Sequence, residues 1–295
     1  MSVHPEPQPP SAMKIILIMM LLPTCLIAGE LPVLKGLILD LDAEKDVSLE
    51  EGNKVAQWEN QAPEGSARLF VKQDEGRKAP GSGRPQLRNA IDSLNGKSSL
   101  VFRQGELVNH DEDAFDSLIT GSGFTWLCVA SVHQQRVGLK NVNALFGNLR
   151  NGGKYEGLWA CLRDDNSLWT SPRNGVTFGR FDQNNPLLLG PELEKERFYV
   201  IAGRMAAGKG SVLTELYLNT PKPVASTVFP VNPQANSSKL VIGQERDAIK
   251  HPGFESFDGE IARLLIYKRP LGENELAKTI QHLIDTYAIK VDTVD

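Results

Sequence analysis

The chain has 295 residues, of which 41% are hydrophobic and 23% charged, as in ordinary globular proteins. Its 32 basic and 36 acidic residues give a net charge of −4, so we expect no nucleic-acid partner, which would require many phosphates to be neutralised. The 26 glycines and 18 prolines follow no period, which indicates many turns and excludes collagen and coiled-coil classes.

The first 29 residues have the pattern of a secretory signal peptide. Lys14 precedes the uncharged run 15–27, and the small residues Ala28 and Gly29 follow it. A helix needs about 20 residues to cross the hydrocarbon core of a bilayer, so this run is too short for a stable span but has the length of a signal peptide. We expect cleavage near these small residues, and a mature domain over residues 30–295 that is secreted, periplasmic or on the cell surface.

Two alternatives for this segment stay open. Met13 stands directly before the basic residue, so translation could begin there instead of at Met1. Cys25 could belong to a lipoprotein signal, but Thr24 occupies the place where glycine, alanine or serine is expected. We therefore favour simple secretion, although an uncleaved signal would tether the chain.

The rest of the chain consists of short runs rich in β-branched and aromatic residues, separated by Gly, Pro, Asn and Asp. About ten strands with little helix between them predict an antiparallel β-sandwich, because a parallel sheet needs crossover helices. No change of composition divides this part, so we expect one domain. The strands are expected near residues 34–41, 54–59, 98–103, 124–133, 142–149, 156–163, 198–204, 212–219, 238–243 and 259–268.

One helix is expected at the end of the chain, over residues 271–287. Apolar residues recur there at helical spacing, and Glu273 and Glu275 stand in the first turn, where the helix dipole favours acids. The apolar stripe should pack on the sandwich. Its members are Leu276, Ile280, Leu283, Ile284 and Tyr287.

Several segments occur in the order found in one known family. They are Gly36–Ala43 (GLILDLDA), Val55–Gln61 (VAQWENQ), Arg84-Pro85, Leu94–Lys97 (LNGK), Val101-Phe102, Glu215–Asn219 (ELYLN) and Phe257–Tyr267 (FDGEIARLLIY) followed by Arg269-Pro270-Leu271. Together they resemble the LamG-like jelly-roll domains of the concanavalin A-like lectin/glucanase superfamily. The resemblance implies a concanavalin A-like jelly roll that binds a glycan or another extracellular polymer or protein. The chain departs from the family's pattern at Glu59–Ala62 and at Thr220, which affects local turns.

The run Gly203–Gly210 contains the Gly-x4-Gly-Lys part of a phosphate-binding loop. However, Gly210 replaces the magnesium-binding Ser or Thr, and a strand-like segment follows where a helix should begin. The run is therefore interpreted as a hairpin loop.

Glycoside hydrolysis requires two carboxylates about 5 to 10 Å apart across the sugar. The glucanase branch of the superfamily carries them as Glu-x-Asp-x-x-Glu on one strand, and neither Asp111–Asp116 nor Glu192–Glu196 has that spacing. We expect no catalytic residues and a non-catalytic binding module. Two alternatives remain: a divergent glycoside hydrolase or lyase whose carboxylates come from separate strands, and a structural cell-surface module.

The five histidines are scattered without the spacing of a zinc site, so no cofactor is expected. Calcium is an alternative, because oxygen ligands can come from loops in any arrangement. Asp111 and Asp113 are the candidate ligands.

Aromatic rings are candidates for sugar binding, because the apolar faces of sugars stack on exposed rings while amides and carboxylates bind the hydroxyls. Trp159 and Trp169 flank a polar turn, and we predict a ligand site there, with core packing as the alternative for each ring. Trp58 and Trp126 are expected in the core. The turn consists of Arg163, Asp164, Asp165 and Asn166.

Loss of the signal peptide would leave two cysteines, Cys128 and Cys161. An oxidising compartment would permit a disulfide between them, stabilising the fold by roughly 3 to 4 kcal/mol. Two buried thiols are the equal alternative, because the sequence does not fix the distance between the two residues.

Overall fold

The structure is a computed structural model that describes Met1 and residues 30–72, 83–135, 141–151, 153–179, 181–245 and 255–291. Residues from Leu31 onward form one compact unit. The expected signal peptide and Cys25 lie outside the described residues, apart from Met1. In the described part of the chain, no helix is long and apolar enough to cross a membrane.

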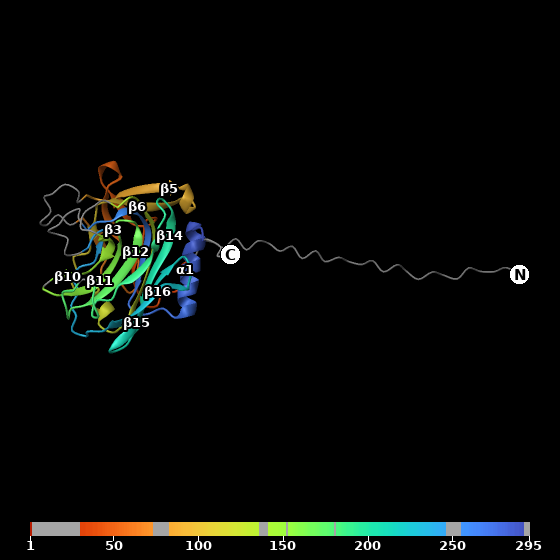
Figure 1. The fold of residues 1–295 in the computed structure, drawn as a ribbon. Helices are drawn as coiled ribbons and strands as arrows, with labels where there is room; N and C mark the ends of the chain where they lie inside the picture. Colours follow the sequence, from red (N-terminus) through yellow and green to blue (C-terminus); the bar gives the residue numbers. More distant parts are fainter. Residues whose placement is uncertain are drawn as a thin grey trace. The chain divides into compact units, whose positions relative to one another are not determined.

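The chain forms two antiparallel sheets, which confirms the predicted β-sandwich (Figure 1). Sheet A has the order β16-β15-β14-β8-β18-β6-β5, and β1 pairs with β18. Its strands are β1 (Leu37–Asp42), β5 (Gln86–Ile91), β6 (Lys97–Arg103), β8 (Phe124–Val132), β14 (Phe198–Met205), β15 (Ser211–Leu218), β16 (Pro223–Pro230) and β18 (Asp258–Tyr267).

Sheet B has the order β13-β12-β11-β9-β17-β7-β4-β3-β2, and β10 pairs with β11. Its strands are β2 (Val47–Leu49), β3 (Val55–Glu59), β4 (Leu69–Val71), β7 (Leu107–Val108), β9 (Asn143–Gly147), β10 (Arg150–Asn151), β11 (Tyr155–Leu162), β12 (Ser167–Asn174), β13 (Leu188–Glu192) and β17 (Val241–Ile242). Short 3-10 helices lie at η1 (Glu51–Asn53), η2 (Asp92–Leu94) and η3 (Asp116–Ile119).

Strand alternation places the core between the sheets and a second apolar layer outside sheet A. In β8, Trp126 belongs to the inner core, as does Trp58 of β3, which confirms both predictions. Leu127 of β8 faces outward and packs in one cluster with helix α1 (Glu273–Tyr287), whose predicted apolar stripe is buried except for the partly buried Ile284. Helix α1 therefore covers part of the outer face of sheet A.

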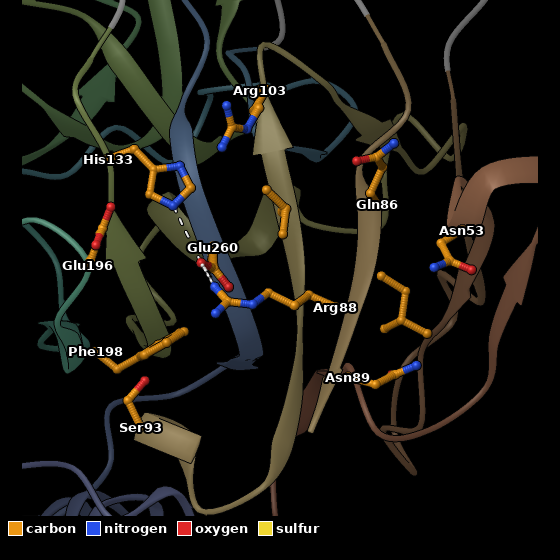
Figure 2. A pocket seen from close by; sticks show the side chains of 12 residues that line it. Asn53, Gln86, Arg88, Asn89, Ser93, Arg103, His133, Glu196, Phe198 and Glu260 are labelled. Carbon is orange, nitrogen blue, oxygen red and sulfur yellow. Dashed lines mark hydrogen bonds and ion pairs between the residues drawn. The ribbon is translucent and has the colours of Figure 1, made fainter. Parts of the chain in front are cut away.

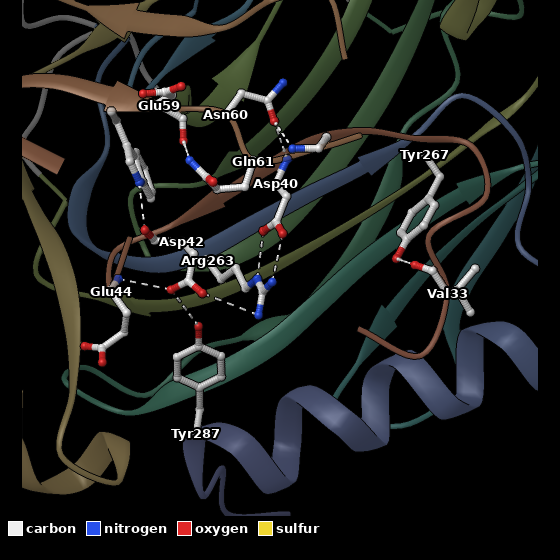
Figure 3. A network of polar contacts seen from close by, with 12 residues as sticks. Val33, Asp40, Asp42, Glu44, Glu59, Asn60, Gln61, Arg263, Tyr267 and Tyr287 are labelled. Atoms are coloured by element: carbon white, nitrogen blue, oxygen red, sulfur yellow. Dashed lines mark hydrogen bonds and ion pairs between the residues drawn. The ribbon is translucent and has the colours of Figure 1, made fainter. Parts of the chain in front are cut away.

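The first and the last of the segments that resemble the LamG-like family lie side by side, because β1 pairs with β18. Figure 3 shows the polar network that connects them. Arg263 of β18 donates two hydrogen bonds to Asp40 and lies 3.5 Å from an oxygen of Asp42. Tyr287 of α1 donates a hydrogen bond to Asp42 (3.4 Å), so the network also joins the helix to the sheet.

β18 contains a bulge between Ile261 and Arg263, where its register with β8 shifts. Before the bulge, Glu260 faces outward and Ile261 faces the core. After it, Leu264 faces the core and Leu265 faces helix α1. A bulge inserts one extra residue and so reverses which positions of the strand face outward.

The cysteines do not form the disulfide that was one of the two alternatives. Cys128 of β8 belongs to the inner core, whereas Cys161 of β11 lies on the outer face of sheet B beside Trp159 and Trp169. The two side chains thus point to different layers. Burial raises the pKa of the Cys128 thiol well above its usual value.

In the run Gly203–Gly210, residues 203–205 end β14 and residues 206–210 connect it to β15, and the two strands pair in antiparallel fashion. This confirms the hairpin interpretation.

Candidate functional site

The turn 163–166 was the predicted ligand site, and in the structure its polar groups hold the turn and its neighbours. Asp165 accepts hydrogen bonds from the amide and hydroxyl of Ser167, which lower the pKa of its carboxyl. Asp164 accepts from the amide of Asn141 and the side chain of Asn143. These hydrogen bonds occupy one carboxylate oxygen of each aspartate.

The other two turn residues differ in burial. Asn166 is buried, adopts a left-handed backbone conformation (φ 67°) and accepts a hydrogen bond from Gln135. Arg163, which is partly exposed, pairs through its backbone with Asn166 and Ser167 in the turn. The polar groups of this turn thus contribute to its own structure, and a ligand there stays a prediction.

Trp159 and Trp169 are each only 2% exposed, so neither ring offers an open stacking surface, and core packing, the alternative kept open for each ring, describes both. Both lie on the outer face of sheet B, with ring centroids 5.2 Å apart and an edge-to-face angle of 78°. The indole nitrogen of Trp169 donates to the carbonyl of Asn141. Phe181, from the segment between β12 and β13, packs on Trp169 with ring centroids 5.5 Å apart, and the guanidinium of Arg173 lies 5.3 Å from the ring of Trp159.

The candidate calcium ligands Asp111 and Asp113 lie in consecutive turns. Asp111 Oδ1 accepts a hydrogen bond from the amide of Asp113, and the amide of Asp111 donates to Asn109. Among the residues that the structure describes, no group of three or more His, Cys, Asp or Glu side chains is arranged to hold a metal ion. A calcium ion at this position stays a prediction.

The candidate site that the structure offers instead is a pocket of about 1020 Å³ on the outer face of sheet A, beside the area covered by α1. It crosses the neighbouring strands β14, β8, β18, β6 and β5 (Figure 2). Alternation explains its wall: in β6, Leu100 and Phe102 face the core, so Val101 and Arg103 face the pocket. The lining residues are Asn53, Gln86, Leu87, Arg88, Asn89, Ser93, Val101, Arg103, His133, Glu196, Phe198 and Glu260.

Glu260 is the centre of the hydrogen bonding in the pocket wall. Its Oε1 accepts from Arg88 (2.8 Å) and lies 3.4 Å from His133 Nε2, while its Oε2 accepts from the Ser99 hydroxyl (2.6 Å). Burial alone would raise the pKa of this carboxyl, but the hydrogen bonds from His133 and Ser99 lower it. Glu260 therefore stays ionised and holds its neighbours in fixed positions.

His133 lies between two carboxylates, since its Nδ1 is 3.2 Å from Asp258 Oδ1. Hydrogen bonds to Asp258 and then to Glu260 raise the pKa of His133 to about 9. The imidazole is thus charged at neutral pH. Gln135 fixes this end of β18 by exchanging hydrogen bonds with the backbone of Asp258.

Around this fixed wall stand exposed polar side chains. Arg103 has no ion pair with another described residue, and the same holds for Glu196 on the other side of His133 (Figure 2). Gln86 and Asn53 add amides on the β5 side. The pocket thus combines guanidinium, carboxylate and amide groups that can donate hydrogen bonds to hydroxyls or accept hydrogen bonds from them.

The sequence contained no local signal for this pocket. Its lining comes from positions between Asn53 and Glu260, and single polar residues on the outer side of strands look like ordinary solvated surface. The one available hint was His133, a polar residue that directly follows the apolar run of β8. Only the pairing of β6, β18 and β8 brings these side chains together.

No protein-family profile matches the chain, and no curated protein does. Similar solved structures include Trypanosoma rangeli sialidase in complex with 2,3-difluoro-KDN, at 13% identity and a TM-score of 0.51, covering 87% of this chain and 34% of the sialidase chain. The chain thus spans about a third of that protein. At this identity the likeness shows a shared β-sandwich fold.

Two smaller binding domains are also similar. One is the Ruminococcus gnavus IT-sialidase CBM40 bound to α2,3-sialyllactose, at 15% identity, a TM-score of 0.42, and coverage of 57% of this chain and 91% of that chain. The other is the binding domain of botulinum neurotoxin DC in complex with SialylT, at 9% identity, a TM-score of 0.46, and coverage of 84% and 52%.

Proposed function

We propose that this protein is a non-catalytic carbohydrate-binding domain whose ligand occupies the pocket on sheet A. The observation that carries the proposal is the composition and order of the pocket wall. Arg88, His133 and Glu260 are held in place by one another, and Arg103 and Gln86 stand exposed beside them. A saccharide presents many hydroxyls, which such groups bind without first having to be ordered.

The proposal includes three features of the chain that the sequence predicted. The protein would be a LamG-like member of the concanavalin A-like superfamily, and it would reach the cell surface, the periplasm or the medium through the signal peptide. Its partner would be a glycan, or another extracellular polymer rich in hydroxyls. A pocket on the outer face of a sheet can accommodate a long polymer, because no described strand covers the pocket.

Binding of the wild-type protein to a panel of immobilised glycans tests the proposal. The double variant Arg103→Ala/Gln86→Ala removes two exposed side chains that hold no other described residue, so the fold should persist. We expect its affinity to fall at least about tenfold, which corresponds to about 1.4 kcal/mol. The matched control is Lys222→Ala/Gln234→Ala, which changes two exposed residues outside the pocket and should bind as the wild type does.

Three results would each overturn one part of the proposed function. Failure of the wild-type protein to bind any glycan would overturn the function. Undiminished binding by the double variant would overturn the pocket as the site. Release of new reducing ends from a bound glycan would show that the protein is a glycoside hydrolase or lyase, and would thus overturn its non-catalytic status.

A further inference from the structure

We propose that the protein has a second saccharide site on the outer face of sheet B, where a pyranose ring stacks on Phe178 and Phe181. The site would lie on the opposite side of the sandwich from the pocket. The choice of a sugar as ligand rests on the proposed function. The existence of two separate sites goes beyond it.

Phe178 and Phe181 are exposed, whereas the other described phenylalanine and tryptophan rings are not. Phe178 is 53% exposed and Phe181 is 45% exposed. They belong to the covering segment, which we define as residues 175–179 and 181–187 between β12 and β13. Large apolar groups that stay in water at one place mark a surface that binds something.

The rings rest on an ordered support. Phe178 stacks on Tyr155 with centroids 4.6 Å apart and an interplanar angle of 16°. Phe181 meets Trp169 edge to face, and the guanidinium of Arg173 lies 5.1 Å from its centroid. Each ring is thus fixed from beneath by the aromatic cluster of sheet B, so a ligand would not have to order it.

The backbone of the covering segment is cross-linked by its own side chains. Asp182 accepts hydrogen bonds from the Thr177 hydroxyl and from the amides of Asn184 and Asn185. Asn185 in turn donates to the carbonyl of Gly179 at 2.7 Å. These bonds join the two arms of the segment, one carrying Phe178 and the other Phe181.

The chemistry of the surface favours a sugar over an apolar partner. A pyranose has an apolar C–H face and a rim of hydroxyls, so it needs flat rings with hydrogen-bonding groups next to them. Gln183 and Asn184 lie two and three positions after Phe181; Gln183 is exposed and Asn184 is partly exposed. Both carry amide side chains, which can donate hydrogen bonds to hydroxyls and accept hydrogen bonds from them.

Two sites on opposite faces would make one protein molecule bivalent. Such a protein joins two glycan chains, or two stretches of one chain, and its apparent affinity for a polymer exceeds the affinity of either site.

The test measures how many molecules of an oligosaccharide bind per protein, by titration calorimetry of the full chain, using the sugar selected on the glycan panel. We expect two for the wild type and one for Phe178→Ala. Phe178→Leu keeps an apolar side chain over Tyr155 but removes the flat ring, so it should also bind one and shows that lost folding is not the cause. Phe178→Trp should still bind two.

Val228→Ala is the matched control, since Val228 is an apolar side chain, 58% exposed, on sheet A. It should bind two. The pocket variant Arg103→Ala/Gln86→Ala should bind one, and its combination with Phe178→Leu should bind none. The wild type should also precipitate a soluble polymer of the same sugar, whereas each single-site variant should not.

The second site is overturned if the wild type binds one sugar, or if Phe178→Ala and Phe178→Leu leave the number at two. In that outcome the pocket variant would still lose binding, and the proposed function would stand. Loss of binding in the Phe178 variants alone, with the pocket variant unaffected, would instead keep this site and overturn the pocket.

Discussion

Arg263 and Asp40 lie 223 positions apart in the sequence and form two parallel hydrogen bonds, Nε to Oδ1 and Nη2 to Oδ2, both at 2.8 Å. Their side chains are only 8% and 9% exposed. The surrounding carboxylates raise the pKa of Arg263 despite its burial, which by itself lowers it. This pair connects the neighbouring strands β1 and β18 of sheet A next to helix α1.

Replacement of Arg263 by methionine should lower the free energy of unfolding by about 3 to 5 kcal/mol, because the charges of Asp40 and Asp42 would remain buried without their partner. Urea titration measures this loss. Lys268→Gln is the control: it removes an exposed ion pair with Glu64 and should cost less than about 1 kcal/mol. Equal losses of unfolding free energy in the two variants would contradict the prediction that the buried pair contributes more than the exposed pair.

Stability should fall as the pH rises from about 6.5 to about 9. The folded-state pKa of His133, about 9, exceeds the unfolded value of 6.5, so the stabilisation is complete below pH 6.5 and is lost as the pH passes through 9. Partial solvent screening limits the effect to about 1 to 2 kcal/mol. Urea titrations at several pH values measure the slope, and NMR of the ring protons measures the pKa.

The variant His133→Gln should lose most of this slope, since glutamine has no charge to titrate. His110→Gln, at an exposed histidine, serves as the control and should keep the slope. An unchanged slope in His133→Gln would assign the pH dependence to other groups.

Asn60 makes four buried hydrogen bonds: its oxygen accepts from the amides of Asp40 and Ala62, and its nitrogen donates to the carbonyls of Ile38 and Ala67. Asn60→Asp keeps the size but cannot donate, and it would bury a charge. We expect a loss of about 2 to 4 kcal/mol in thermal or urea unfolding. Gln57→Glu, an exposed change of the same kind on β3, should be nearly neutral, and a small effect of Asn60→Asp would contradict the assigned geometry.

Reduction should not change the melting temperature, because Cys128 and Cys161 form no disulfide. Both thiols are buried, so iodoacetamide should label them only after the protein unfolds. Mass spectrometry of the native and unfolded protein checks both statements. A peptide pair joined through these cysteines would refute the prediction.

The sequence predicted the class of the fold because strand alternation and turn residues are local signals. Each of the ten expected strand regions contains a strand, and α1 matches its apolar stripe. Two of the strands that were missed contain proline. Strand β12 contains Pro172, and β16 begins and ends with proline at an edge of sheet A, where the missing amide hydrogen of proline is tolerated.

The site was harder to predict, because composition does not show which side of a strand is covered. Trp159 and Trp169 flank a polar turn in the sequence, yet both rings are buried, and Phe181 of the covering segment packs on Trp169. The exposed rings are Phe178 and Phe181, which lie in a segment without alternation. The pocket depends on pairing between β6, β18 and β8, and no local sequence pattern specifies which strands pair with one another.

The bulge at Ala262 divides β18 into two halves that follow separate alternations. Residues before it, such as Glu260, form the pocket, and residues after it, such as Arg263 and Tyr267, join the sheet to β1 and α1. A substitution at Glu260 would therefore change the pocket wall without removing the contacts of the second half with β1 and α1. Deletion of Ala262 would join the two alternations into one, so that the residues of one half would exchange their core-facing and outward positions. A single extra residue thus allows the same strand to face the pocket in one half and helix α1 in the other.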